Sequence, residues 1–312
     1  MQTILLSFGL IILLGAAFKW LRPGGLDPGQ VRAAINVTVL NLFLPSLCIR
    51  TLYGARIDMK TVLVPMTAWV STLGALFVSV SIYGILRRRM DLAPPEAGVL
   101  VLGATFGNVT YLGLPVLTGL YGSEAAKYAL YYDLLATTPL LWLVGAGLAA
   151  RYGRGKRMTF RESLKTIATL PPVWGIFAGM TLNLLQIPLP QGVIKALEML
   201  GSPVVPLMIF SIGLALSLPK VRHAFAIIPA VIIKLSVVPL FSFLAASALG
   251  LRGDALASCL VEGGMPAMVL LLLIAARFKL DVSLAAFIVI ITTAVSFVSL
   301  QVVVHLAKYL IA

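Results

Sequence analysis

The sequence predicts an all-α polytopic membrane protein with ten transmembrane helices arranged as two inverted five-helix repeats. Of its 312 residues, 60% are hydrophobic and only 11% are charged, whereas soluble domains are nearer half apolar and a quarter charged. The apolar residues form ten segments, each able to supply the roughly 20 residues that cross a bilayer. The basic stretch 151–165 leaves five segments on either side. An odd number of spans per half gives the two halves opposite orientations.

The expected spans are residues 3–20, 32–52, 61–86, 96–121, 124–150, 166–186, 192–218, 222–250, 254–277 and 281–309. The loops between them are short. We therefore expect one membrane domain, built from a first repeat (1–150), a basic cytoplasmic linker (151–165) and a second repeat (166–312). The first span follows Met1-Gln2 without a basic leader, so we expect it to be retained and not cleaved as a signal peptide.

The basic residues set the expected orientation. With the N-terminus outside, the inner loops hold Lys19, Arg22 and Arg32, then Arg87 to Arg89, then the bases of residues 151–165, then Lys220 and Arg222, and then Arg277 and Lys279. The outer ends hold fewer bases, as the positive-inside rule requires. The net charge of +13 is therefore read as membrane topology. We expect a cell-membrane location with both termini outside, membrane lipid as a partner, and no nucleic-acid partner.

Nothing in the sequence is typical of a metal site or an enzyme. Cys48 and Cys259 lie within apolar spans, and His223 and His305 are far apart in the chain. No Cys/His cluster has metal-ligand spacing, and the common phosphate-binding, zinc-protease and nucleophile motifs are absent. We expect no metal, no cofactor and no catalytic residues.

Two expected spans contain residues that interrupt a helix. Segment 96–121 contains Gly107-Asn108-Val109-Thr110-Tyr111-Leu112-Gly113-Leu114-Pro115, and segment 254–277 contains Glu262-Gly263-Gly264-Met265-Pro266. Glycine and proline disfavour an unbroken helix. Interrupted spans at corresponding positions of two halves point to the binding site of a transporter. A half-helix N-terminus attracts negative charge, so the expected substrate is a small organic anion bearing a carboxylate.

The expected substrate-binding residues are Asn108, Thr110, Tyr111, Glu262, Gly264 and Met265, and the expected helix-break residues are Gly107, Pro115, Gly263 and Pro266. Purely structural roles remain open for two of them. Asn108 could cap backbone groups that the bend leaves unpaired, and Glu262 could be a group near the outer face of the membrane.

Asp133, Lys234 and Glu262 are ionisable residues within spans, where charge is costly and functional. They are candidates for coupling transport to protons or sodium, or for buried pairs with one another. The sequence does not decide which of them pair.

Several stretches together resemble the auxin efflux carrier family. Phe106 to Pro115, followed by Leu120-Tyr121-Gly122, is similar to that family's fourth span, and Asn41 to Leu47 is similar to its second. Weaker likenesses follow in order at Pro172 with Gly175 and Gly179, at Pro206 with Ile212-Gly213, at Gly264 to Ala267, and at Thr292-Thr293 with Ser296.

This resemblance implies ten spans in inverted repeats, two broken helices crossing at the membrane midplane, a scaffold domain with a moving transport domain, and often a homodimer. It implies organic-anion transport: auxin in plants, and small carboxylates such as malonate or malate in some bacterial members. It also places Asn108, Pro115 and Pro266 at the crossover. It does not account for Glu262. Without the long central loop of the plant carriers, the chain looks like a bacterial-type member.

The resulting hypothesis is a secondary transporter, similar to an efflux carrier, that moves a small organic anion by alternating access. The alternative within transport is a sodium-coupled bile-acid-type symporter or a cation/proton antiporter of related architecture. The alternative from another class is an intramembrane enzyme or a sensory membrane module. An enzyme would need a convergent catalytic set and a sensor an attached signalling domain, and neither is visible in the sequence.

Overall fold

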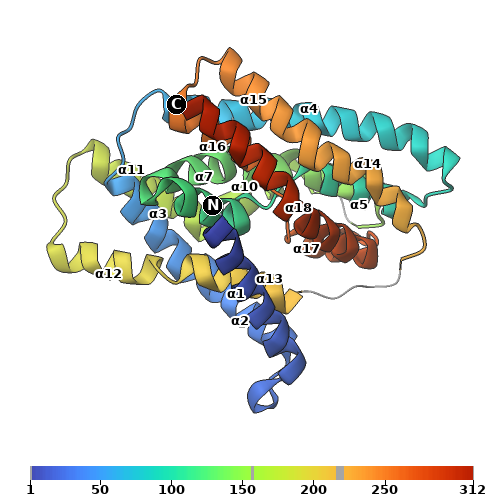
Figure 1. The fold of residues 1–312 in the computed structure, drawn as a ribbon, viewed down its shortest axis with the longest axis horizontal. Helices are drawn as coiled ribbons and strands as arrows, with labels where there is room; N and C mark the ends of the chain where they lie inside the picture. Colours follow the sequence, from blue (N-terminus) through green and yellow to red (C-terminus); the bar gives the residue numbers. More distant parts are fainter. Residues whose placement is uncertain (1, 156–157, 216–220, 312) are drawn as a thin grey trace. The chain divides into compact units, whose positions relative to one another are not determined.

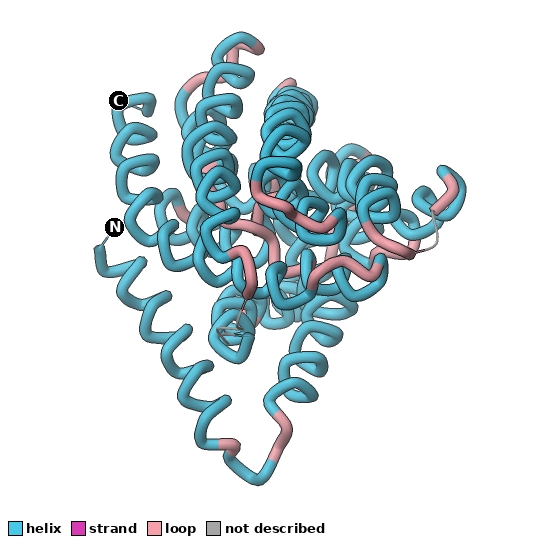
Figure 2. Tube along the Cα trace, turned by 90° about the vertical axis from the view of Figure 1, so that its right-hand side faces the viewer, coloured by secondary structure: helices cyan, strands magenta, loops and turns pink. Residues whose placement is uncertain are grey.

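A computed structural model describes residues 2–155, 158–215 and 221–311, and these are almost entirely helices joined by short loops (Figure 2). Within these ranges the β-structure is limited to one isolated antiparallel bridge, between Gly107 and Ala267. Some predicted features lie outside the described residues: Lys156 and Arg157 of the basic linker, residues 216–218 of the seventh span, and Lys220.

Six helices in the described ranges are long and apolar enough to cross a membrane, and a bent helix pair raises the number to seven. The six are Pro28–Tyr53, Lys60–Arg89, Ser123–Tyr152, Gln191–Ala215, Ala224–Ala248 and Val282–Tyr309; the bent pair is Phe160–Ala168 with Pro171–Leu184. Val109–Tyr121 and Leu6–Leu21 are apolar but shorter. The protein is therefore polytopic and all-helical, and the total of ten spans stays a prediction.

The chain divides into two compact units, each assembled from separate stretches of sequence. Unit 1 comprises Met1–Met59, Thr110–Leu130 and Ala168–Leu216. Its main helices are α1 (Gln2–Leu21), α2 (Pro28–Thr38), α3 (Leu44–Tyr53), α6 (Leu114–Tyr121), α11 (Pro171–Leu184), α12 (Gln191–Gly201) and α13 (Val204–Ala215) (Figure 1).

Glycines let the helices of unit 1 approach closely. Where α1 packs on α13, a Cβ added to Gly15 would lie only 3.0 Å from the Cα of Gly213. Where α11 packs on α3, a Cβ on Gly175 would lie 2.8 Å from the Pro45 carbonyl oxygen. Small residues at helix contacts are typical of membrane proteins, because association there depends on close backbone packing.

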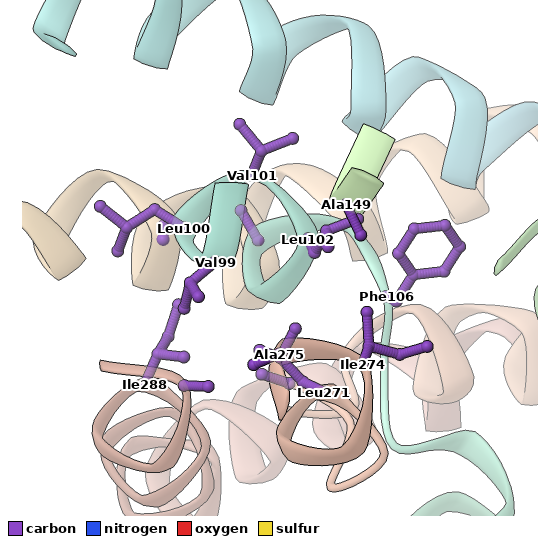
Figure 3. Packing of buried hydrophobic residues seen from close by; sticks show 14 of the residues in the cluster. Val99, Leu100, Val101, Leu102, Phe106, Ala149, Leu271, Ile274, Ala275 and Ile288 are labelled. Carbon is purple, nitrogen blue, oxygen red and sulfur yellow. The ribbon is translucent and has the colours of Figure 1, made fainter. Parts of the chain in front are cut away.

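Unit 2 comprises Lys60–Val109, Tyr131–Ile167 and Ser217–Ala312. Its main helices are α4 (Lys60–Arg89), α5 (Pro94–Thr105), α9 (Ala146–Tyr152), α14 (Ile227–Ile232), α15 (Val238–Ala248), α16 (Gly253–Gly263), α17 (Leu271–Phe278) and α18 (Val282–Ile311). Helix α5 lies at the centre of its core, with Val99 and Leu102 packed among side chains of α9, α17 and α18 such as Ala149, Leu271 and Ile288 (Figure 3).

Four π-helical turns precede prolines. The turns are η2 (Val39–Phe43), η3 (Val109–Gly113), η5 (Asp133–Thr137) and η8 (Ile233–Val237), and the prolines that follow are Pro45, Pro115, Pro139 and Pro239. Proline has no N–H, and its ring collides with the carbonyl four residues earlier. The helix accommodates it by widening one turn, as in the bond from the Val238 N–H to the Ile233 carbonyl, five residues back. Such π turns are frequent at functional sites, and Asp133 and Lys234 lie in two of them.

Candidate binding site at the helix crossover

Two helices of unit 2 are interrupted where the sequence analysis placed its breaks. Helix α5 ends at Thr105, Phe106 is extended, and the chain becomes helical again at Val109. Helix α16 ends at Gly263 and α17 begins at Leu271. The two interruptions thus leave short non-helical segments, 106–108 and 264–270, within otherwise helical sequence.

The two interrupted segments pair with each other in an antiparallel arrangement. The Asn108 N–H donates to the Pro266 carbonyl at 2.7 Å, the Met268 N–H donates to the Phe106 carbonyl at 3.1 Å, and Gly107 faces Ala267 in the bridge. The Ala267 N–H donates to the Thr292 hydroxyl of α18 at 3.1 Å. Broken backbone within a membrane must find protein partners or water. Here each break supplies partners for the other.

We call the paired segments 106–108 and 264–268 the crossover. Lys234, in π turn η8, points its ammonium at this crossover. Its Nζ donates to the Gly263 carbonyl at 3.0 Å, and the residue is 1% exposed. A helix C-terminus carries partial negative charge and unsatisfied carbonyls, so the ammonium caps α16 at its break. A Cβ added to Gly107 would lie 3.2 Å from Nζ. Glycine at 107 therefore leaves room for the lysine.

Glu262 and Asn108 hold buried polar atoms without partners. Glu262 is 1% exposed and Asn108 is 2% exposed. Neither carboxylate oxygen of Glu262 nor Nδ2 of Asn108 makes a hydrogen bond within the described residues. Glu262 is thus enclosed by protein and does not reach the molecular surface. Such atoms are costly to bury, and side chains of this kind at a helix break are suited to holding a ligand.

Lys234 and Glu262 influence each other electrostatically without forming a direct ion pair among the residues described. Asp133 also acts on Glu262 through its charge. Asp133 is half-buried and accepts a hydrogen bond from the Thr138 hydroxyl at 2.9 Å. Of the three ionisable residues singled out from the sequence, Lys234 and Glu262 belong to the crossover itself, and Asp133 lies nearby.

A row of buried hydroxyls beside the crossover escaped the sequence analysis. The Tyr132 hydroxyl lies 3.0 Å from the Ser71 hydroxyl of α4 and 2.8 Å from that of Ser242 in α15. Ser242 packs against Gly263, where an added Cβ would lie 2.8 Å from the Ser242 Cβ. The available signal was weak, because serines within apolar spans usually hydrogen-bond to their own helix.

The remaining predicted residues fall in different units. Gly264 and Met265 are buried beside Pro266 in the second interrupted segment of unit 2. Thr110 and Pro115 are buried and Tyr111 is half-buried, and all three belong to unit 1. The crossover of unit 2 therefore brings together the predicted residues Gly107, Asn108, Lys234 and residues 262–266.

Unit 1 contains a separate cavity of about 430 Å³. Its charged lining residues already have partners: Arg50 bonds Glu198 at 2.9 Å, and Lys127 lies 3.7 Å from Glu124. The crossover is the stronger candidate site, because it holds buried polar atoms that have no hydrogen-bond partner in the part of the chain that the structure describes.

A polytopic helical protein whose broken helices pair at a buried, charged crossover has the features of a membrane transport protein. Comparison with known sequences agrees with this class. The profile of the membrane transport protein family matches residues 5–167 and 157–304. The chain belongs to this family, which is that of the auxin efflux carriers.

Its relatives are named as transporters. An uncharacterized transporter of Methanothermobacter thermautotrophicus is 30% identical over 302 residues, covering 95% of this chain and 94% of the relative. An uncharacterized transporter of Methanocaldococcus jannaschii is 31% identical over 229 residues, covering 71% of this chain and 72% of the relative. A Rhizobium meliloti protein named "Putative malonate transporter" is 24% identical over 227 residues, covering 70% of this chain and 69% of the relative. Family and relatives thus indicate a transporter and not an enzyme.

Proposed function

We propose that the protein is a secondary active transporter that carries a small organic anion across the cell membrane by alternating access. The observation that carries this proposal is the set of buried polar groups at the paired helix breaks. The Asn108 amide has an N–H group to donate, and the Lys234 ammonium, held at the Gly263 carbonyl, supplies positive charge. These groups suit a carboxylate, which accepts charge-assisted hydrogen bonds.

The anion would be bound mainly by side chains. The N–H groups of Asn108, Ala267 and Met268 already bond within the crossover, so they are not the donors that recognise the substrate. We propose Asn108 and Lys234 as the residues that contact the carboxylate, with Gly264 and Met265 lining the site and Gly107, Gly263 and Pro266 shaping it. Thr110 and Tyr111 as substrate contacts, and Pro115 as the residue that shapes the half-helix after the first break, belong to unit 1 and stay predictions from the sequence.

Ten spans in two inverted repeats, 1–150 and 166–312 joined by the linker 151–165, remain part of the proposal. Each compact unit draws spans from both sequence halves. Spans one and two join spans six and seven in unit 1, and span three joins spans eight to ten in unit 2. Corresponding spans of the two sequence halves thus fall in the same unit, which supports the proposed repeat. Residues 110–130 depart from it, because they group with unit 1 while the corresponding α17 belongs to unit 2.

Three further parts of the hypothesis accompany this proposal: both termini outside, coupling to protons or sodium, and a homodimer in membrane lipid. The name of the Rhizobium relative suggests malonate as the first substrate to test. The competing transport function, a sodium-coupled symporter or cation antiporter, typically needs paired buried acids. The crossover instead combines one acid with a lysine.

Proteoliposomes test the proposal directly. Vesicles that contain the purified protein should take up labelled acetate, malonate, malate or succinate under a proton or sodium gradient. Asn108→Ala should lower this uptake at least tenfold. Gln301→Ala is the matched control, because this amide is exposed on α18. Failure of every carboxylate under both gradients would refute organic-anion transport. Unchanged uptake by Asn108→Ala would remove Asn108 from the site.

A further inference from the structure

The charges at the crossover indicate how an anion could enter a buried site. Lys234 and Glu262 are each 1% exposed, and Lys234 bonds the Gly263 carbonyl, not the Glu262 carboxylate. The site therefore contains a lysine held in place by a hydrogen bond and an acid whose oxygens have no hydrogen-bond partner among the described residues. Burying net charge away from water costs several kcal/mol per ion. During transport, a conformation in which the buried charges of the site sum to zero is therefore favoured.

In the cycle proposed below, the site without an anion holds a charged Lys234 and an ionised Glu262, so that its charges balance. When a carboxylate binds at Asn108 and Lys234, a second negative charge enters the same dry region. Repulsion between the carboxylate and Glu262 is strong at low dielectric. The charges balance again if Glu262 takes up a proton. A second negative charge in the same site favours this protonation, because it disfavours the ionised form of the carboxyl group.

We propose that Glu262 takes up one proton for each carboxylate that binds beside Lys234, so that anion and proton travel together. This inference rests on the anion-transport function proposed above and names its coupling ion. The proton comes from solvent and forms the carboxylic acid of Glu262. It leaves when the anion leaves, and no other bond is made or broken.

The neighbours of Glu262 support proton coupling. The charged groups that act on Glu262 are Asp133 and Lys234, and the charge of Glu262 acts in turn on Tyr132 and Cys259. The helices α4, α15 and α18 also pack on α16, and their sequences contain no acid. Their bases lie near the ends of α4 (Lys60 and Arg87 to Arg89) and of α18 (His305 and Lys308).

The buried hydroxyls supply a second, geometric observation. Ser71, Tyr132 and Ser242 form a hydrogen-bonded row from three separate elements, and the row ends against Gly263, next to Glu262. Each hydroxyl can both donate and accept a hydrogen bond. Such a row can pass a proton towards the end of α16.

Proton release or uptake on binding provides the test. Purified protein in weak buffer with a pH indicator would receive acetate, malonate or succinate separately, with affinity measured between pH 5.5 and 8.5. The wild type should take up about one proton per bound anion, and the dissociation constant should rise up to about tenfold per pH unit on the alkaline side. In Glu262→Gln, which resembles the protonated acid, binding should persist with no proton uptake and a flat pH profile.

Asp254→Asn is the matched control, because Asp254 is an exposed acid on the same helix; it should behave like the wild type. Anion binding by the wild type without proton uptake would overturn the inference while leaving anion transport intact, and this measurement does not depend on any variant folding. Proton uptake that survives in Glu262→Gln would also overturn it. If acetate, malonate and succinate all fail to bind and no carboxylate is transported, anion transport itself is refuted, and the inference with it.

Discussion

Lys234 makes two demands on its surroundings: its ammonium needs acceptors, and its charge needs a counter-charge. The Gly263 carbonyl meets the first demand at 3.0 Å, and Glu262 meets the second without direct contact. Removing one member of such a buried set leaves the other uncompensated, which costs more than removing both.

The paired removal of Lys234 and Glu262 can be measured as a double-mutant cycle. Lys234→Met and Glu262→Gln should each lower thermal stability, and the double variant should be less destabilised than the sum. We expect a coupling free energy of about 0.5–3 kcal/mol, the range for interacting neighbours. Unfolding in detergent, followed by intrinsic fluorescence, gives the three values. Strict additivity would show that the two residues do not interact.

Thr292 supports the crossover through a single hydroxyl. It accepts the Ala267 N–H at 3.1 Å and donates to the Ile288 carbonyl at 2.7 Å. Thr292→Val keeps the shape but leaves that N–H buried and unpaired, which should cost about 1–3 kcal/mol. Thr292→Ser should recover most of this stability.

The adjacent Thr293 is the control for this prediction. Its hydroxyl donates to the Val289 carbonyl of its own helix. Thr293→Val should therefore cost less than Thr292→Val when thermal unfolding is compared. Equal losses for the two valine variants would show that the Ala267 bond does not stabilise the crossover.

At the scale of elements, the π turns and the breaks have local causes. A proline follows each of four π turns by two residues, and one turn of the helix widens to accommodate it. In a regular helix the side chain of a residue such as Lys234 would point in a different direction. The paired breaks then depend on close approach of backbone, which glycine permits.

Neighbouring glycines at the second break should differ in tolerance. A Cβ on Gly263 would lie 2.8 Å from the Ser242 Cβ and 3.0 Å from the Pro239 Cα, whereas one on Gly264 would meet atoms no closer than 3.3 Å. Gly263→Ala should therefore destabilise the fold by about 1–3 kcal/mol through overpacking, and Gly264→Ala by less. Comparing the melting temperatures of the two purified variants checks the order, and the reverse order would contradict the packing described for α16.

At the scale of the whole molecule, the proposed topology assigns opposite sides of the membrane to the two ends of α4. Met59 precedes this helix and is exposed, and Arg88 lies in its exposed last turn. In a background with Cys48 and Cys259 replaced by alanine, Met59→Cys should react with a membrane-impermeant maleimide on intact cells. Arg88→Cys should react only after permeabilisation. The opposite pattern would place both termini inside.

The membrane class and the positions of the breaks could be predicted from the sequence because their causes are local. Apolar length reports on the bilayer, and proline and glycine act on their own few residues, as Pro266 and Gly263 show. The roles of Thr292 and of the Tyr132 hydroxyl row could not be predicted. Each depends on partners far away in the chain, and a serine or threonine in an apolar span usually bonds to its own helix.

The sequence by itself thus determined an all-helical membrane protein, the interruptions near Asn108 and Pro266, and Lys234 and Glu262 as buried charges of interest. Only the tertiary structure decided that the two interruptions pair with each other, that Lys234 caps the end of α16, and that Glu262 keeps its oxygens without a protein donor among the described residues. The physical reason is the distance along the chain over which each interaction acts. Helix formation and breaking are set within a few residues, whereas pairing and burial depend on which distant segments pack together.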